Sequence, residues 1–343
     1  MPLRSREIRL AARPRGLPAL RDFELAEVEL PDPAEGQVLV RNAYVSVDPY
    51  MRGRMNDVRS YVPPFEVGAP LTGGAVGQVV ASANDAWPEG AWVVHDLGWR
   101  EAALVDSQRM RLVDPSAVPL STALGVLGMP GLTAFVGIAD IAEVREGDTV
   151  FVSGAAGAVG SLAGQLARLR GARVIGSAGS AAKLESLAEL GFDATFDYHE
   201  TRPRAALREL APDGIDVYFD NVGGETLEAA IGALNRYGRI AACGSIAGYN
   251  ATEAMPGPRN MFLVVTKRLR MQGFIVFDHF ERWSAFVDEV APRVADGTIG
   301  YRETVVDGIE HTPEAFLSLF AGDNVGKMLV RVGPVVSDSK SDT

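Results

Sequence analysis

Residues 149–296 alternate between short apolar segments and segments with helical spacing, and no other sequence feature constrains the fold as much. Strict alternation of strands and helices is typical of a parallel sheet covered on both faces. Six strands complete a dinucleotide-binding sheet. We therefore predict an α/β fold with a Rossmann-type, doubly wound, parallel six-strand sheet. The predicted strands cover residues 149–153, 172–177, 194–198, 215–221, 238–243 and 269–277. The predicted helices cover residues 160–171, 181–191, 204–210, 226–234 and 283–296.

The two ends of the chain have a different texture from this middle part. Residues 120–137 have the composition of buried helix. Within the middle part, the apolar run at residues 261–266 is interpreted as part of a buried element. Short strands punctuated by Gly, Pro and Asp are typical of a β-rich domain. They are predicted at residues 37–43, 75–81, 91–95, 102–105, 301–306 and 327–332, with a helix at 312–322.

A chain of 343 residues is long enough for two domains. Because strand texture returns after the alternating segment, we predict a β-rich domain with the nucleotide domain inserted in it. The predicted β-rich domain covers residues 1–125 and 312–343, and the predicted nucleotide domain covers 126–311.

A glycine-rich turn follows the first predicted strand of the sheet. Ala155 replaces the first glycine of the dinucleotide fingerprint, whereas Gly157 and Gly160 are present. Gly157 allows a pyrophosphate to approach the backbone, and Gly160 allows the next helix to pack closely on the strand. An ordinary tight turn is the alternative for the motif alone. Since this turn opens a six-strand alternating unit, we predict nucleotide binding.

The end of the second predicted strand bears on which nucleotide binds. An NAD site usually has Asp or Glu about 20 residues after the glycine loop. Here residues 177–180 read SAGS, with no carboxylate, and Lys183 follows within one helical turn. Small residues leave room for a 2′-phosphate, and a lysine supplies positive charge to it. A solvated helix residue is the alternative for Lys183, but the two observations together favour NADP(H).

Charge and hydropathy exclude several classes of partner. The chain has 33 basic and 44 acidic residues, a net charge of −11, which disfavours nucleic acid and anionic membranes as partners. No segment has the length of a signal peptide core or of a membrane span. We expect a cytoplasmic protein.

The chain has one cysteine, Cys243, in the fifth predicted strand of the sheet. One cysteine excludes an internal disulfide and a thiolate-rich zinc site. The four histidines, His95, His199, His279 and His311, are dispersed and form no spaced ligand pair. We therefore expect no zinc. No G-x-S-x-G sequence occurs, so a hydrolase has no support.

Without a metal, hydroxyl and backbone N–H groups are left to stabilise developing negative charge. Tyr249 follows the fifth predicted strand, and ligands bind at the carboxyl ends of such strands. Tyr50 and Tyr61 flank the sequence MRGR in the N-terminal part. For Tyr249 a site residue and an amphipathic residue at a domain interface remain equal alternatives. For Tyr50 and Tyr61 the interface interpretation is favoured on the residues alone.

Several sequence blocks together resemble one family. They are VDPYMRGRM at 47–55, GMPGLTA at 128–134, AAGAVGS at 155–161, FDNVGG at 219–224, GFIV at 273–276 and NVGK at 324–327. In this order, from about residue 38 to 332, they resemble the zinc-free medium-chain dehydrogenases/reductases. The similar group contains leukotriene B4 12-hydroxydehydrogenase/prostaglandin reductase, plant alkenal double-bond reductases and bacterial curcumin reductase.

This resemblance implies a GroES-like β-rich catalytic domain beside the Rossmann domain. It also implies NADPH-dependent reduction of the carbon–carbon double bond of an α,β-unsaturated aldehyde or ketone, an activity of class EC 1.3.1. The enolate that follows hydride transfer would be stabilised by hydrogen bonds, and Tyr249 matches the tyrosine proposed to assist it. Tyr50 and Tyr61 match positions near the substrate.

The resemblance further implies the cofactor contacts. Gly157, Ala158, Val159 and Gly160 would hold the pyrophosphate, and Ser180 and Lys183 would meet the 2′-phosphate. Tyr198 would lie near the adenosine, and Asn221 near the central part of the cofactor. Further contacts would come from Cys243, Gly244 and Ser245, mainly through backbone, from Tyr249, and around the nicotinamide from Phe274, Ile275, Val276 and Asn324.

Two other functions remain open at this point. An NADPH-dependent quinone oxidoreductase would use the same cofactor site with a more open pocket. A nucleotide-binding protein without turnover would use only the cofactor site. Members of the similar group are commonly homodimers joined at the sheet edge, and residues 262–276 are where such an interface is expected.

Overall fold

The computed structural model describes residues 3–335. The chain forms two compact units. Of the described residues, unit 1 contains 3–124, Thr304–Asp323 and 328–335, and unit 2 contains Gly125–Glu303 and Asn324–Lys327. The chain thus returns to unit 1 at Thr304, whereas the sequence placed the return at residue 312. Among residues 3–335, no helix combines the length and apolar composition needed to cross a membrane.

Unit 2 is built on a six-stranded sheet in the order β10-β9-β8-β11-β12-β13, and every neighbouring pair is parallel. The predicted doubly wound sheet is confirmed. Its strands are β8 (Thr149–Val152), β9 (Arg173–Ala178), β10 (Ala194–Asp197), β11 (Ile215–Asp220), β12 (Leu234–Ala242) and β13 (Arg270–Gly273). Its helices are α2 (Met129–Val136), η4 (Gly137–Ile141), α3 (Ala158–Leu169), α4 (Ala181–Glu189), α5 (Pro203–Leu210), α6 (Gly224–Ala233), η5 (Ile246–Gly248), α7 (Phe262–Lys267), η6 (Val276–Arg282) and α8 (Trp283–Ala295).

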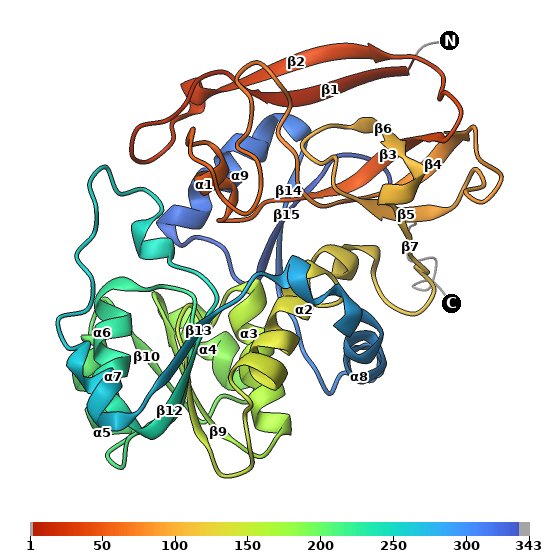
Figure 1. The fold of residues 1–343 in the computed structure, drawn as a ribbon. Coiled ribbons are helices and arrows are strands. Elements are labelled where there is room, and N and C mark those ends of the chain that lie inside the picture. The colour runs from red at the N-terminus through yellow and green to blue at the C-terminus, as the bar shows by residue number, and fades with distance from the viewer. Residues whose placement is uncertain (1–2, 336–343) are drawn as a thin grey trace. The chain divides into compact units, whose positions relative to one another are not determined.

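Both faces of this sheet are covered, as the apolar strands require. Helices α5, α6 and α7 lie on one side of it (Figure 1). Phe151 and Tyr218, stacked with ring centroids 5.0 Å apart, point into this layer. Phe219, the next residue on β11, points to the opposite side, where a Cβ at Gly137 would lie 2.4 Å from its ring.

Unit 1 is β-rich, and its larger sheet has the order β14-β15-β3-β4-β5-β7, with β6 also paired to β3. A separate antiparallel hairpin pairs β1 with β2. The core of unit 1 contains Trp99 and Phe316, whose ring centroids lie 5.7 Å apart. Its strands are β1 (Leu3–Leu10), β2 (Phe23–Leu30), β3 (Gln37–Ser46), β4 (Ala75–Ser82), β5 (Trp92–His95), β6 (Ala102–Asp106), β7 (Arg111–Leu112), β14 (Glu303–Asp307) and β15 (Lys327–Arg331). Its helices are η1 (Leu20–Asp22), α1 (Met51–Arg54), η2 (Ser107–Arg109), η3 (Leu120–Leu124), η7 (Ile309–His311) and α9 (Thr312–Ala321).

Three local expectations were incomplete or wrong. The β1–β2 hairpin was not predicted. The sixth strand of the sheet ends at Gly273 instead of residue 277, because the chain turns into η6. The apolar run at 261–266 forms most of α7, which contains no buried residue, and Phe262 and Val265 are 74% and 68% exposed.

Candidate functional site

The glycine loop joins β8 to α3, and its glycines have different steric roles. A Cβ at Gly160 would lie 2.5 Å from the carbonyl oxygen of Gly154, so the helix could not approach the strand with a larger residue there. At Gly157, which precedes the first residue of α3, the nearest atom would be 3.3 Å away. The N–H groups in the first turn of a helix have no acceptors within the helix. This turn can therefore bind an anion such as a pyrophosphate.

The ends of β9 and β10 lie side by side, since the Tyr198 N–H donates to the Ala178 carbonyl at 3.1 Å. Ser180 precedes α4 with extended backbone angles, and its hydroxyl caps no backbone N–H. Lys183 lies in the first turn of α4 and is half-buried, whereas Tyr198 is 44% exposed. The structure thus brings together the strand ends that carry the residues predicted for the 2′-phosphate and the adenosine.

A buried polar cluster, which the sequence analysis missed, joins the ends of β8 and β11. The Tyr218 hydroxyl lies 2.7 Å from Asp220 Oδ1 and 2.9 Å from Ser153 Oγ. Asp220 Oδ1 also accepts from the N–H groups of Val222 and Gly223 at 2.9 and 2.8 Å. Burial raises the pKa of the Asp220 carboxyl. The hydrogen-bond donors around the carboxyl lower this pKa by a smaller amount, so the net shift is upward. We call Ser153, Tyr218 and Asp220 the Asp220 cluster.

The Asp220 cluster holds Asn221 against the glycine loop. The Asn221 amide donates to the Ser153 carbonyl at 2.8 Å, and the Asn221 N–H donates to Ser153 Oγ at 3.1 Å. The sequence did carry a signal for the loop part of this arrangement. An Asp that ends a strand before a Gly-containing turn commonly accepts from backbone N–H groups two residues on.

The residues after β12 meet the end of β11. The N–H groups of Cys243 and Gly244 both donate to the Asp220 carbonyl at 2.9 Å. Burial raises the pKa of the Cys243 thiol to about 12, so the thiol stays protonated at neutral pH. This agrees with a role for the Cys243 backbone and not for its sulfur.

Tyr249 folds back over this turn. The Ser245 N–H donates to its phenolic oxygen at 3.4 Å, and a Cβ at Gly244 would lie 3.3 Å from the same oxygen and from the Asn221 carbonyl. Burial raises the pKa of the Tyr249 phenol, which the Ser245 N–H opposes. The phenol therefore remains a hydrogen-bond donor at neutral pH.

The residues predicted around the nicotinamide lie on two segments. Phe274 and Ile275 follow β13, and Val276 begins η6. The Asn324 amide donates to the Gly326 carbonyl at 2.7 Å, and the Gly326 N–H donates to the Ala156 carbonyl of the glycine loop at 2.8 Å. Asn324 is thus held next to the glycine loop of unit 2.

The two N-terminal tyrosines lie in unit 1. Tyr50 directly precedes α1, and burial raises the pKa of its phenol, as does the carboxylate of Asp48, whereas Arg54 opposes this. The Arg54 guanidinium lies over the Phe65 ring at 4.0 Å and donates to the Thr72 hydroxyl at 3.0 Å. Tyr61, in the loop after α1, is 52% exposed.

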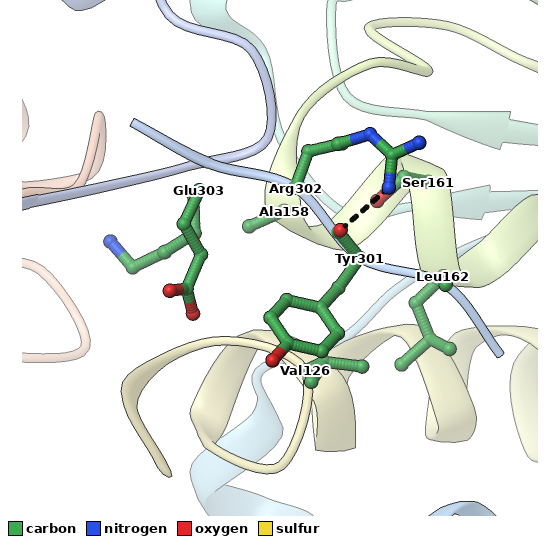
Figure 2. Close-up of a pocket in the computed structure, with 9 residues that line it drawn as sticks. Val126, Ala158, Ser161, Leu162, Tyr301, Arg302 and Glu303 are labelled. Carbon is green, nitrogen blue, oxygen red and sulfur yellow. Dashed lines mark hydrogen bonds between the residues drawn. The ribbon is translucent and has the colours of Figure 1, made fainter. Parts of the chain in front are cut away.

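A small hollow lies beside the first turn of α3 (Figure 2). Glu303, Lys327, Ser161 and Tyr301 line its polar part, and the Tyr301 carbonyl accepts from Arg302 at 3.1 Å. Of the predicted site residues, Ala158 alone lines this hollow.

His95 lies in the interior of unit 1, with Nε2 2.8 Å from Asn42 Oδ1 and Nδ1 accepting from the Leu97 N–H at 3.1 Å. Burial lowers its pKa to about 3, so the ring is neutral. Its neighbour Asp96 pairs with Arg109. Within residues 3–335, no three His, Cys, Asp or Glu side chains gather in a way that could hold a metal ion.

Comparison with known proteins places this geometry in a family. The N-terminal domain of oxidoreductases matches residues 6–113, and the family described as zinc-binding dehydrogenase matches 158–292. The NADPH-dependent curcumin reductase of Escherichia coli is 43% identical over 96% of this chain and 97% of its own length. The 2-alkenal reductase (NADP(+)-dependent) of Nicotiana tabacum is 41% identical over 92% of this chain and 94% of its own.

A similar solved structure supports the same family. The structure of CurA from Vibrio vulnificus in complex with NADPH is 42% identical, with a TM-score of 0.91, and the match covers 96% of this chain and 100% of that one. The family predicted from the sequence blocks is thereby confirmed. This chain belongs to the medium-chain dehydrogenases/reductases, in the family of the curcumin reductases, 2-alkenal reductases and prostaglandin reductases.

Proposed function

We propose that this chain uses NADPH to reduce the carbon–carbon double bond of α,β-unsaturated ketones and aldehydes. Two relatives more than 40% identical over nearly their whole length are named as an NADPH-dependent curcumin reductase and an NADP(+)-dependent 2-alkenal reductase. The observation that carries the proposal is the convergence of Tyr249, Asn221 and Gly244 at the ends of β11 and β12. This is the edge of a parallel sheet where ligands bind.

The residues of unit 2 fit a dinucleotide with a 2′-phosphate. The first turn of α3, from Ala158 through Val159 to Gly160, offers N–H groups to the pyrophosphate, and Gly157 leaves its approach open. No carboxylate stands at the end of β9, and Ser180 and Lys183 follow it. A carboxylate there would bind ribose hydroxyls and repel a phosphate. We assign NADP(H) as the cofactor on these grounds.

When bound, NADPH supplies the hydride that adds to the β-carbon of the substrate. The protein has to orient the substrate and to stabilise the negative charge that then develops on the carbonyl oxygen. We assign this charge stabilisation to the protonated phenol of Tyr249. Protonation of the α-carbon then completes the addition of two hydrogens across the double bond. Tyr50 and Tyr61 are proposed to contact the substrate, and Phe274, Ile275, Val276 and Asn324 to contact the nicotinamide.

We propose no zinc in this chemistry, since the chain has a single cysteine and dispersed histidines. We assign substrate binding mainly to the β-rich unit and NADP(H) binding to unit 2. A cytoplasmic location is proposed on the single cysteine, because reducing compartments do not support disulfides. A homodimer is proposed through residues 262–276, where β13 forms one edge of the sheet with every residue exposed.

The experiment that tests the activity is an NADPH-oxidation assay against a panel of enones, enals and quinones, with saturated ketones as controls. We expect consumption of enones and enals, and NMR of the product should show a reduced carbon–carbon bond beside an intact carbonyl. Turnover of quinones alone would establish the quinone oxidoreductase alternative. NADPH binding without turnover of any panel member would establish a binding protein.

A further inference from the structure

Two aromatic rings lie over the turn between β9 and α4. A Cβ at Gly179 would lie 2.6 Å from Tyr198 Oη and 2.8 Å from His199 Cε1. The two rings also contact each other, with centroids 4.3 Å apart. The residue after Gly179 is Ser180, whose hydroxyl is not used to cap α4. His199 therefore lies at the same strand ends as the residues assigned to the 2′-phosphate, although neither the sequence motif nor the family resemblance pointed to it.

The hydrogen bonds of His199 define which ring nitrogen carries the proton. Nδ1 lies 3.2 Å from the Gly179 carbonyl oxygen and 3.4 Å from Asp197 Oδ1. Both of these oxygens are acceptors, so we assign the proton of the neutral ring to Nδ1. Nε2 of the neutral ring is then an acceptor, and it becomes a donor only when the imidazole is protonated.

The His199 ring has a carboxylate neighbour and is open to solvent. Asp197 on β10 lies next to Nδ1 and also accepts from the His199 N–H at 2.8 Å. Glu200 follows directly in the chain, and Lys183 is the charged residue in the first turn of α4. The His199 side chain is 66% exposed, so water is available to solvate the imidazolium. The Asp197 carboxylate thus lies beside the ring nitrogen to which we assign the proton.

We propose that His199 is a specificity-determining residue for the cofactor, whose protonated ring donates an Nε2–H hydrogen bond to the 2′-phosphate. This proposal rests on the assignment of NADP(H) above and adds a pH dependence to it. A phosphate dianion only accepts hydrogen bonds, so the neutral ring, with its Nε2 lone pair outward, gains nothing from it. The imidazolium forms a charge-assisted hydrogen bond.

The sign of the pH effect follows from linkage. Binding of the 2′-phosphate favours the protonated ring, so the pKa of His199 is higher in the complex than in the unliganded protein. The additional affinity is complete below the lower of these two values and is lost as the pH rises through the higher one. NADH has no 2′-phosphate, so its affinity lacks this dependence. The preference for NADPH over NADH is therefore strongest on the acidic side of neutrality.

The test measures dissociation constants of NADPH and NADH by calorimetry between pH 5.5 and 8.5. The proteins compared are the wild type, His199→Gln and, as a matched control, His311→Gln, which removes an exposed histidine of unit 1. In the wild type and the control we expect the preference for NADPH to fall roughly three- to tenfold from pH 6 to 8.5 relative to His199→Gln, in line with a shift of up to one pKa unit. The second ionisation of the phosphate itself, near pH 6, affects all three proteins equally.

An identical pH profile in the wild type and His199→Gln would overturn the proposal. A second readout is the NMR titration of the His199 ring, whose pKa should rise with NADP⁺ and not with NAD⁺. Equal affinity for NADPH and NADH at every pH would instead overturn the cofactor assignment itself. Lys183→Ala separates the two further, since it should lower the preference for NADPH at all pH values and leave the His199-dependent slope in place.

Discussion

At the scale of single residues, Tyr249 carries the proposed chemistry. Its phenolic oxygen is held by the Ser245 N–H, and burial keeps its proton in place at neutral pH. In Tyr249→Phe the developing oxyanion loses one donor, so we expect kcat for enone reduction to fall about 10²-fold. NADPH affinity should stay close to that of the wild type, because the glycine loop is unchanged. Steady-state kinetics and NADPH titration measure both quantities.

The control for this variant is Tyr237→Phe, at a tyrosine that is 69% exposed. It should leave kcat unchanged. If Tyr249→Phe retains the wild-type kcat, another group stabilises the oxyanion and Tyr249 has no part in the reaction.

Asp220 gives a prediction for stability against pH. Burial raises the pKa of its carboxyl above the ordinary value of 3.8, so the folded chain favours the protonated form. This contribution to stability is present at low pH and is lost as the pH rises through the folded pKa. Asp220→Asn has no ionisable group there. Between pH 4 and 7 the wild type should therefore lose stability relative to Asp220→Asn, as measured by urea unfolding.

Asp296 provides a control of opposite sign. Hydrogen bonds from Thr298 lower the pKa of its exposed carboxyl, so the wild type should gain stability relative to Asp296→Asn as the pH rises. A difference between the wild type and Asp220→Asn that does not change with pH would show that the Asp220 carboxyl has an ordinary pKa in the folded chain.

The residue scale also shows what sequence spacing can and cannot predict. The spacing predicted where Gly157 and Gly160 would lie, because a strand, a tight turn and a helix are local. Asp220 escaped prediction because its cluster depends on tertiary contact. The Tyr218 hydroxyl meets Ser153 across 65 residues of sequence. Only the pairing of β8 with β11 creates that contact.

At the scale of elements, the two glycines at the start of α3 have different roles, one in packing and one in ligand binding. In Gly160→Ala the new methyl group would meet the backbone of Gly154 and Ala155 at 2.5 and 2.9 Å. We expect a loss of about 1–3 kcal/mol in the free energy of unfolding. In Gly157→Ala the nearest atom is 3.3 Å away, so stability should change much less. That methyl group would obstruct the pyrophosphate, so NADPH affinity should fall.

Urea unfolding and NADPH titration of both variants measure the two effects. Stability loss in Gly157→Ala equal to that in Gly160→Ala would contradict the steric distinction. NADPH affinity unchanged in Gly157→Ala would contradict the placement of the pyrophosphate.

The alternating strands and helices of the six-stranded sheet were predictable, whereas strand β1, which has inward polar residues, was not. Strand β1 has the sequence LRSREIRL, in which Ser5 and Glu7 are both buried. The Ala102 N–H donates to the Ser5 hydroxyl at 3.0 Å, and Arg9 donates to the Glu7 carboxylate at 2.8 Å. These partners are brought to Ser5 and Glu7 only by folding. The sequence of β1 therefore lacks the apolar alternation by which a strand is recognised. Helix α7 shows the converse, because its apolar residues Phe262 and Val265 are exposed.

At the scale of the whole molecule, net charge and local chemistry diverge. A chain with a net charge of −11 would repel polyanions in general. In the proposed NADP(H) site, backbone N–H groups and a few cationic side chains attract the phosphates of the cofactor despite this negative net charge. The net charge therefore bears on polyanionic partners such as nucleic acid. It does not predict whether a local site binds an anionic cofactor.

The exposed apolar residues of unit 2 lead to a prediction about assembly. Strand β13 lies at one end of the six-stranded sheet with all of its residues exposed, and the adjoining α7 exposes Phe262 and Val265. Open sheet edges beside apolar surface favour pairing with another chain. Light scattering should give twice the chain mass of 36.5 kDa for the wild type and for Leu17→Asp, an exposed apolar position in unit 1. Val265→Asp should give the mass of one chain, and a dimer unaffected by Val265→Asp would place the interface elsewhere.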